Sequence, residues 1–185
     1  NVHLPDGSHR SFSMASCPAG ARVDFHIRRI PGGRFTDGEL TQLQPGDALE
    51  VELPLGSFRL HPQDYRPIVM LATGTGLAPL KSMLESLKGD EDCPPVHLYW
   101  GARTAADFYE LPHWQEWQTL ANLRVQRVVS EDPHWPGRRG LLHAAVREDF
   151  ADLKPLHVYA SGSPGMVYAT LDALVEAGMD AQQMR

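Results

Sequence analysis

Short apolar runs alternate with longer stretches of helical periodicity along the second half of the chain. The apolar runs predict buried strands, and the stretches between them predict helices. Strands that alternate with helices are typical of parallel βαβ units, which bind ligands at the carboxyl ends of their strands. The pattern therefore predicts strands over 68–72, 96–101, 124–129 and 156–160, and helices over 77–88, 111–120, 141–149 and 164–177.

The first half of the chain has a different pattern, in which polar and apolar residues alternate as they do in half-buried strands. Strands are predicted over 10–16, 22–30 and 48–55, and turns that contain proline and glycine separate them. These features predict a small antiparallel β domain.

One short helix is predicted within this β domain. It covers 36–43, because Thr36 can act as its cap and Glu39 follows three residues later. A polar, proline-bearing stretch follows the last strand, so that we expect one domain over 1–63 and a second, α/β domain over 64–185.

The segment Gly74-Thr75-Gly76 connects the first strand of the α/β domain to its helix. Glycines let the backbone approach a ligand closely, and the start of the following helix presents unpaired N–H groups and the positive end of a dipole. Pro79 fits the first helical turn, where its missing N–H costs nothing. The segment predicts a pyrophosphate-binding turn, and a tight strand-to-helix turn without a ligand is the alternative.

The residues Gly74, Gly101, Ser130 and Gly162 each fall just after a predicted strand. In a parallel sheet, the carboxyl ends of the strands lie along one rim. We therefore expect these residues to line a nucleotide site together.

The composition indicates a soluble globular protein. The chain has 185 residues, of which 42% are hydrophobic and 22% charged, and this is enough to form one or two small domains. A net charge of −6 disfavours nucleic-acid binding, which needs clustered cations. No apolar run is long enough to span a bilayer, the two cysteines are far apart, and the nine histidines form no recognisable ligand pair. We expect a cytoplasmic protein with no metal site, no nucleic-acid partner and no membrane segment.

The ends of the sequence are unusual for this pattern. The chain starts without methionine inside an apparent strand, and it stops just after the last predicted helix, where a βαβ sheet commonly takes another strand. We therefore expect a fragment of a longer polypeptide that lacks both ends.

Four motifs occur in the order in which one known family has them. Arg10-Ser-Phe-Ser13 and Gly32-Gly-Arg-Phe-Thr36 resemble its flavin motifs, and Gly74-Thr-Gly-Leu-Ala-Pro79 and Tyr159-Ala-Ser-Gly-Ser-Pro-Gly-Met166 resemble its nicotinamide-binding segments. The chain thereby resembles the ferredoxin–NADP⁺ reductase superfamily of flavin- and nicotinamide-dependent electron transferases. Residues 99–109 are most similar to the CDP-6-deoxy-glucoseen reductase type and to the reductases of oxygenases.

The resemblance implies a fold class. It consists of a partial antiparallel flavin-binding β-barrel followed by a doubly wound parallel-sheet domain that binds a nicotinamide nucleotide. Members of the family close their barrel with six strands, whereas about three are predicted here. We therefore expect the chain to retain FAD weakly or not at all, unless another chain completes the barrel.

The resemblance also implies an FAD site in the first half. Arg10 would pair with the flavin diphosphate, Phe12 would lie against the isoalloxazine, and Ser13 would donate a hydrogen bond near N5. Without the other motifs, a plain strand with an outward arginine and an inward phenylalanine would be the better interpretation. The residues expected around the remainder of the FAD are His26, Ile27, Arg28, Gly33 and Thr36.

A nicotinamide nucleotide site is implied in the second half. Thr75 would lie near the nicotinamide ring, and Ser161 stands where many family members carry a cysteine close to the path of the hydride. Ser13, Thr75 and Ser161 are therefore the candidate catalytic residues. The other residues expected to bind the nucleotide are Gly74, Gly76, Gly101, Arg103, Ser130, Gly162, Pro164 and Met166.

Two carboxylates bear on the choice of nucleotide. Glu131 and Asp132 follow the third strand of the α/β domain, where they would repel a 2′-phosphate and could accept hydrogen bonds from ribose hydroxyls. NADH is therefore expected to bind better than NADPH. Arg103, Arg138 and Arg139 are cations that could reach a phosphate and reverse this preference.

Together these expectations predict an oxidoreductase. It would transfer a hydride from NAD(P)H, with NADH preferred, to FAD and then pass single electrons to an iron–sulfur protein or domain of the ferredoxin type. Two alternatives are a free flavin reductase that uses flavin as its substrate and an inactive nucleotide-binding remnant.

Overall fold

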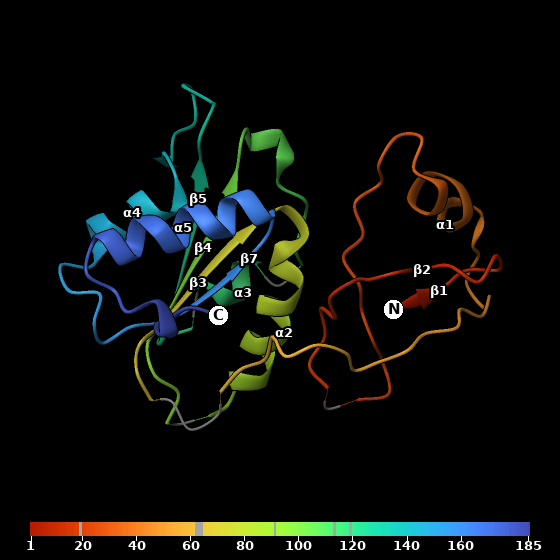
Figure 1. Cartoon of the computed structure of the whole chain (residues 1–185), viewed down its shortest axis with the longest axis horizontal. Helices are drawn as coiled ribbons and strands as arrows, with labels where there is room; N and C mark the ends of the chain where they lie inside the picture. Colours follow the sequence, from red (N-terminus) through yellow and green to blue (C-terminus); the bar gives the residue numbers. More distant parts are fainter. Residues whose placement is uncertain (19, 62–64, 91, 113, 119) are drawn as a thin grey trace.

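The computed structural model describes residues 1–18, 20–61, 65–90, 92–112, 114–118 and 120–185. Figure 1 shows a parallel sheet flanked by helices and, beside it, a smaller lobe formed by the first part of the chain. The boundary predicted between residues 63 and 64 lies outside the described residues. The division into two domains therefore stays a prediction.

The larger part is a parallel sheet of five strands in the order β6-β5-β4-β3-β7. Every pair of neighbours in it is parallel. This order confirms the predicted βαβ arrangement, because consecutive strands β3, β4 and β5 extend in one direction and β7 returns to the other side of β3. The strands are β3 (Ile68–Thr73), β4 (Val96–Ala102), β5 (Leu123–Val129), β6 (Arg138–Arg139) and β7 (His157–Ser161).

Helices cover both faces of the sheet. Alternate residues of β3 point to opposite sides, so that Met70 packs with Leu80 of one helix and Leu71 packs with Val146 of another. Burial on both faces explains why the strands appear in the sequence as continuous apolar runs. The first face carries α2 (Leu77–Leu87) and α3 (Trp114–Trp117), and the second carries α4 (Leu142–Asp149) and α5 (Pro164–Glu176).

The sheet and its helices differ from the prediction in three details. The helix expected over 111–120 is only the short α3, and β6 had no signal in the sequence because two residues are too few to show a period. Gly101 lies inside β4 and not after it, since Ala102 still pairs with Val129 of β5.

The last residues of the chain add to the free edge of β7. The backbone N–H of Arg185 donates to the carbonyl of Val158 at 2.9 Å, and its own carbonyl accepts from Ala160 at 2.9 Å. The neighbouring residue Met184 forms a parallel bridge with Val158. Residues 184 and 185 therefore extend the pairing of the sheet beyond β7, although the sequence analysis predicts no strand there.

The smaller part contains two short antiparallel strands, β1 (Val2–His3) and β2 (His9–Arg10). The strands predicted over 10–16, 22–30 and 48–55 are wrong as continuous elements, because only single bridges join Met14 to Phe25 and Val2 to Val51. A strand needs a continuous ladder of hydrogen bonds to a neighbouring strand, and among the described residues these segments form only isolated β-bridges. An apolar row remains exposed over this region, formed by Leu49, Val51, Leu53, Leu55 and Phe58.

The predicted helix over 36–43 is a π-helical segment, Arg34–Glu39, that continues into α1 (Leu40–Gln42). The interpretation of Thr36 as its cap was wrong. The hydroxyl of Thr36 accepts a hydrogen bond from the backbone of Ile30 at 3.1 Å, so that it closes the preceding turn. The helical segment therefore begins two residues earlier than the capping pattern predicts.

None of the helices in the described parts of the chain has the length and apolar character required to cross a membrane.

Candidate nucleotide and flavin site

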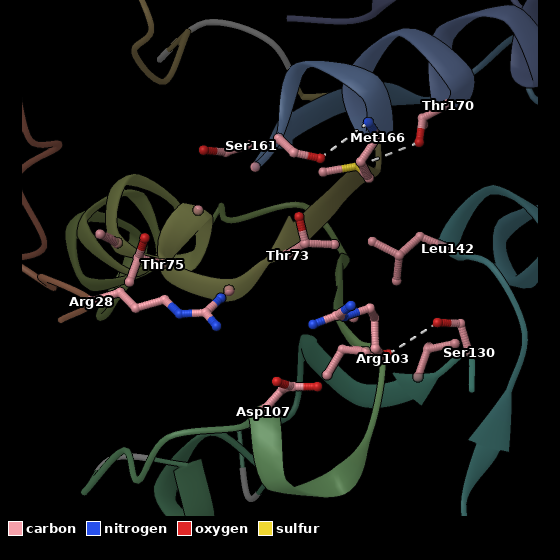
Figure 2. Close-up of a pocket in the computed structure, with 18 of the residues that line it drawn as sticks. Arg28, Thr73, Thr75, Arg103, Asp107, Ser130, Leu142, Ser161, Met166 and Thr170 are labelled. Atoms are coloured by element: carbon pink, nitrogen blue, oxygen red, sulfur yellow. Dashed lines mark hydrogen bonds between the residues drawn. The ribbon is translucent and has the colours of Figure 1, made fainter. Parts of the chain in front are cut away.

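A cavity of about 810 Å³ opens where the carboxyl ends of the sheet strands meet the smaller lobe. Its volume lies in the range of small-molecule and cofactor sites. Residues from both halves of the chain line it (Figure 2). The predicted site residues among them are Phe12, Ser13, His26, Arg28, Gly74, Thr75, Gly76, Gly101, Arg103, Ser130, Ser161, Gly162 and Met166.

The turn Gly74–Gly76 forms one wall of the cavity and leads directly into α2. Gly74 has a φ of +53°, a left-handed conformation that glycine adopts without strain. A Cβ added to Gly74 would meet no atom within 4 Å, so this side of the turn faces open space. The turn can thus accept a ligand against its backbone, as the sequence predicts.

Two neighbouring glycines have a different role. A Cβ on Gly76 would lie 2.2 Å from the carbonyl oxygen of Ser161, and one on Gly162 would lie 2.1 Å from Oγ1 of Thr73. Both contacts join the end of β3 to the end of β7. These glycines therefore allow the two strand ends to approach closely, a reason that the sequence pattern alone does not reveal.

Two arginines face each other across the cavity, Arg28 from the smaller lobe and Arg103 from the end of β4 (Figure 2). Among the described residues, neither guanidinium forms an ion pair with a carboxylate. Two guanidinium groups on opposite walls are suited to bind an anionic ligand such as a diphosphate.

Asp107 lies near both arginines and was missed by the sequence analysis. The backbone N–H and hydroxyl of Thr104, followed by the charges of Arg103 and Arg28, hold the pKa of Asp107 below its usual value. Thr104 and Asp107 form a reciprocal capping box around a single helical turn. The spacing Thr-x-x-Asp is the signal in the sequence that could have identified this residue.

A histidine of the smaller lobe contacts an aromatic residue of the larger part. Nδ1 of His26 lies 2.7 Å from the hydroxyl of Tyr109, and the two rings meet edge to face with centroids 5.2 Å apart. Burial, followed by the charge of Lys81, lowers the pKa of His26, and burial raises the pKa of Tyr109. Both side chains are therefore neutral near pH 7, so that His26 adds no positive charge to the cavity wall.

The wall formed by β7 and α5 carries the predicted nicotinamide segment. Ser163 begins α5 and accepts a hydrogen bond from the backbone of Met166 at 3.3 Å. The hydroxyl of Thr170 donates to the sulfur of Met166 at 3.5 Å, which holds this side chain at the cavity edge (Figure 2). Pro164 opens the helix and does not line the cavity.

Four predicted residues of the flavin side lie away from the cavity. The guanidinium of Arg10 donates to the carbonyl of His9 at 2.8 Å, and Ile27 packs in the small core around Val2. The backbone N–H of Gly33 donates to the carbonyl of Ile30 at 2.8 Å, and Thr36 bonds the same residue as described above. Their assignment to FAD stays a prediction.

A second hollow of about 430 Å³ adjoins the first and shares Ser130 and Gly140 with it. Glu131, Asp132 and Arg139 line this second hollow. Residues of the main cavity that the sequence analysis missed are Ser11, Thr73, Ala78, Ala102, Asp107, Val128, Gly140, Leu141, Leu142, His143, Ser163, Ala169 and Thr170.

Arg138 is held away from both hollows. Its guanidinium bonds the carboxylates of Asp149 and Glu148 and the carbonyl of Ala145. Of the three arginines considered for a 2′-phosphate, only Arg103 and Arg139 therefore remain beside a hollow.

Comparison with known proteins agrees with this geometry. The family model described as "Oxidoreductase NAD-binding domain" matches residues 70–172. Reductase component 1 of terephthalate 1,2-dioxygenase from Comamonas sp is 37% identical over 98% of this chain and 55% of that protein. The CDP-6-deoxy-L-threo-D-glycero-4-hexulose-3-dehydrase reductase of Yersinia pestis is 37% identical over 94% of this chain and 53% of that protein.

A solved structure shares the whole fold. The Amycolatopsis cytochrome P450 reductase GcoB superposes with a TM-score of 0.90 at 32% identity, over 100% of this chain and 57% of that chain. The chain spans about half the length of the curated relatives it matches. The chain belongs to the family of oxidoreductase NAD-binding domains, and its fold is the one found in ferredoxin reductases.

Proposed function

We propose that this chain transfers a hydride from NADH to FAD and that the electrons then pass singly to an iron–sulfur protein or domain. The observation that carries the proposal is that one cavity joins the flavin motif around Phe12 and Ser13 to the turn Gly74–Gly76. A site that must bring two cofactors into contact needs residues from both halves on one surface. The names of the relatives, reductase components of a dioxygenase and of a hexulose dehydrase, support the same function.

Each wall has a separate task in this proposal. The turn Gly74–Gly76 and the start of α2 bind the pyrophosphate of the nucleotide through backbone N–H groups and the helix dipole. Phe12 and Ser13 hold the flavin ring, while Thr75 and Ser161 orient the nicotinamide from the other side. The two guanidinium groups of Arg28 and Arg103 neutralise phosphate charge between them.

FAD, when bound, accepts two electrons as a hydride and releases them one at a time, and this chemistry belongs to the cofactor. The protein residues contribute placement and exclusion of water.

We expect NADH to be preferred, since the second hollow carries two carboxylates beside Arg139. A cytoplasmic location is proposed because Cys17 and Cys93 are both free thiols.

The test begins with an absorbance spectrum of the purified chain and of the chain after incubation with FAD and gel filtration. Because the barrel is incomplete, we expect only part of the flavin to remain after filtration. Bands of this retained flavin that bleach when NADH is added without oxygen support the proposal. Bleaching that requires free flavin in solution, with none retained, supports a flavin reductase. If NADH binds without any flavin reduction, the chain is an inactive nucleotide-binding module and the proposal fails.

A further inference from the structure

One face of α2 carries polar side chains that bond the backbone of the smaller lobe. Nζ of Lys81 donates to the carbonyl of Ala15 at 2.8 Å, and the hydroxyl of Ser82 donates to the carbonyl of Ser16 at 2.7 Å. The carboxylate of Glu85 accepts from the backbone N–H of Cys17 at 3.0 Å. Three consecutive residues of the lobe are thus held by three side chains of one helix.

Lys81 is the most buried charged residue in this contact, with 5% of its surface exposed. It forms an ion pair with Glu85 one helical turn away, and this pair lies between α2 and the lobe. A lysine is rarely buried to this extent unless its charge is paired and its hydrogen bonds are satisfied. On a helix face that contacts only solvent, an ion pair such as Lys81–Glu85 would be exposed.

The contact connects the two halves of the cavity. Gly74–Gly76 leads straight into α2, so the helix is rigidly attached to the nicotinamide turn. The bonded residues 15–17 follow Phe12 and Ser13 after one intervening residue, and Phe12 and Ser13 line the cavity from the lobe. In the same lobe, the backbone N–H of Ala15 donates to the carbonyl of Asp24 at 2.7 Å, so the contact also holds the segment that leads to His26.

We propose that Lys81, Ser82 and Glu85 are positioning residues for hydride transfer. They fix the distance between the flavin side of the cavity and the nicotinamide turn by holding residues 15–17 against α2. This inference rests on the proposed function. The three residues touch neither cofactor in this proposal, and they act through the backbone that they bond.

The test uses the whole chain incubated with FAD. Lys81→Met combined with Glu85→Gln removes the bond to Ala15 and both charges, so that no unpaired buried charge remains to prevent folding. Ser82→Ala removes one hydroxyl without changing charge, and Ser82→Thr restores a hydroxyl. Lys88→Met is the matched control, since Lys88 pairs with Glu116 at the solvent-exposed end of the same helix.

Two measurements separate positioning from general stability. We expect the double variant to slow flavin reduction at saturating NADH about 10- to 100-fold, as for small misplacements of reacting groups, while the Kd for NADH changes less than about twofold. Amide hydrogen exchange over residues 10–17, measured without FAD, should rise about tenfold while exchange in β3 and β4 stays constant. Ser82→Ala should shift both quantities in the same direction by a smaller amount, and Ser82→Thr and Lys88→Met should match the parent.

The outcomes distinguish the two proposals. If the parent chain reduces no flavin, the proposed function fails, and the exchange measurement still decides whether these residues hold the lobe. Unchanged exchange over residues 10–17 in the double variant overturns the inference. A parallel rise in exchange throughout the sheet, or a loss of NADH affinity equal to the loss of rate, also overturns it, because either result indicates a general loss of structure.

Discussion

The indole Nε1–H of Trp100 donates a hydrogen bond to the carbonyl oxygen of Gly74, with 3.2 Å between the two atoms. Trp100 is fully buried in β4, and its ring meets that of Tyr109 edge to face at 4.9 Å. The guanidinium of Arg127 lies 5.5 Å from the same ring. The orientation of the turn Gly74–Gly76 therefore depends on an aromatic cluster whose members Trp100 and Tyr109 do not themselves line the cavity.

Replacement of Trp100 by phenylalanine tests this dependence. The half-buried carbonyl of Gly74 would lose one of its two donors and keep the backbone N–H of Leu77, so we expect a loss of about 1 kcal/mol in the free energy of unfolding. NADH affinity should fall about five- to tenfold, because the turn is no longer held in its binding geometry. Denaturant unfolding and NADH titration measure these effects. Trp114→Phe makes the same change in the same cluster without a bond to the turn, and equal losses of affinity in both variants would contradict the prediction.

Alanine substitutions at two glycines of the turn should differ in cost. Gly76→Ala places a Cβ 2.2 Å from the carbonyl oxygen of Ser161, and backbone atoms cannot move aside cheaply, so we expect a loss of about 3 kcal/mol or more. Gly74→Ala meets open space and suffers only the cost of its positive φ, about 1–2 kcal/mol. Denaturation curves of the two variants provide the comparison, and a larger loss at Gly74 would contradict the geometry.

Ser161→Cys tests the catalytic interpretation of the end of β7. If this side chain faces the reacting carbon of the nicotinamide, cysteine should speed flavin reduction and leave the Kd for NADH nearly unchanged. An interaction that is formed only in the transition state changes the rate of the reaction and does not change the binding of the ground state. Stopped-flow reduction at saturating NADH is the measurement. Ser86→Cys, on α2 away from the cavity, is the control. Identical rates for parent and Ser161→Cys would assign Ser161 a purely structural role.

Removal of both carboxylates from the second hollow should change the choice of nucleotide. Glu131→Gln combined with Asp132→Asn leaves Arg139 as the charged group there, so we expect the affinity for NADPH relative to NADH to rise about tenfold. Binding constants for both nucleotides on the same preparation give the ratio. Asp172→Asn combined with Glu176→Gln, at exposed positions of α5, controls for the change in net charge. A ratio that does not move would show that the 2′ position lies outside this hollow.

Stability should fall as the pH is lowered from 7 towards 5. Burial is the first cause that lowers the pKa of His26, His97 and His143 below 6.5. The unfolded chain then binds protons at a higher pH than the folded chain does, so the stability carried by the neutral rings is present above about pH 6.5 and is lost as the pH falls through the folded values. The lowered carboxylate pKa values, such as that of Asp107, act only at more acidic pH.

Thermal unfolding midpoints between pH 7 and pH 5 check this expectation. His26→Gln removes one of the three titrating rings and should make the decline shallower. A midpoint that rises on acidification would contradict the direction of the shifts.

The sequence by itself determined the α/β half of the molecule. Apolar runs such as 68–72 are buried on both faces, so their pattern depends on local periodicity and could be interpreted without tertiary knowledge. The turn Gly74–Gly76 and the segment around Ser161 were located in the same way, because each glycine cluster directly follows such a run. The smaller lobe was less well predicted, since its strands need partners distant in the sequence, and alternation alone does not show whether residues 48–55 find one.

Only the tertiary structure decided which residues share the cavity. Thr73 approaches Gly162, and Arg28 faces Arg103, although each pair is separated by more than 70 positions in the sequence. The burial of Lys81 also depends on packing between halves, because a lysine within a helical pattern is ordinarily interpreted as a solvent-facing residue. Periodicity records which side of an element is buried, whereas the identity of the neighbour on that side follows from how the elements pack.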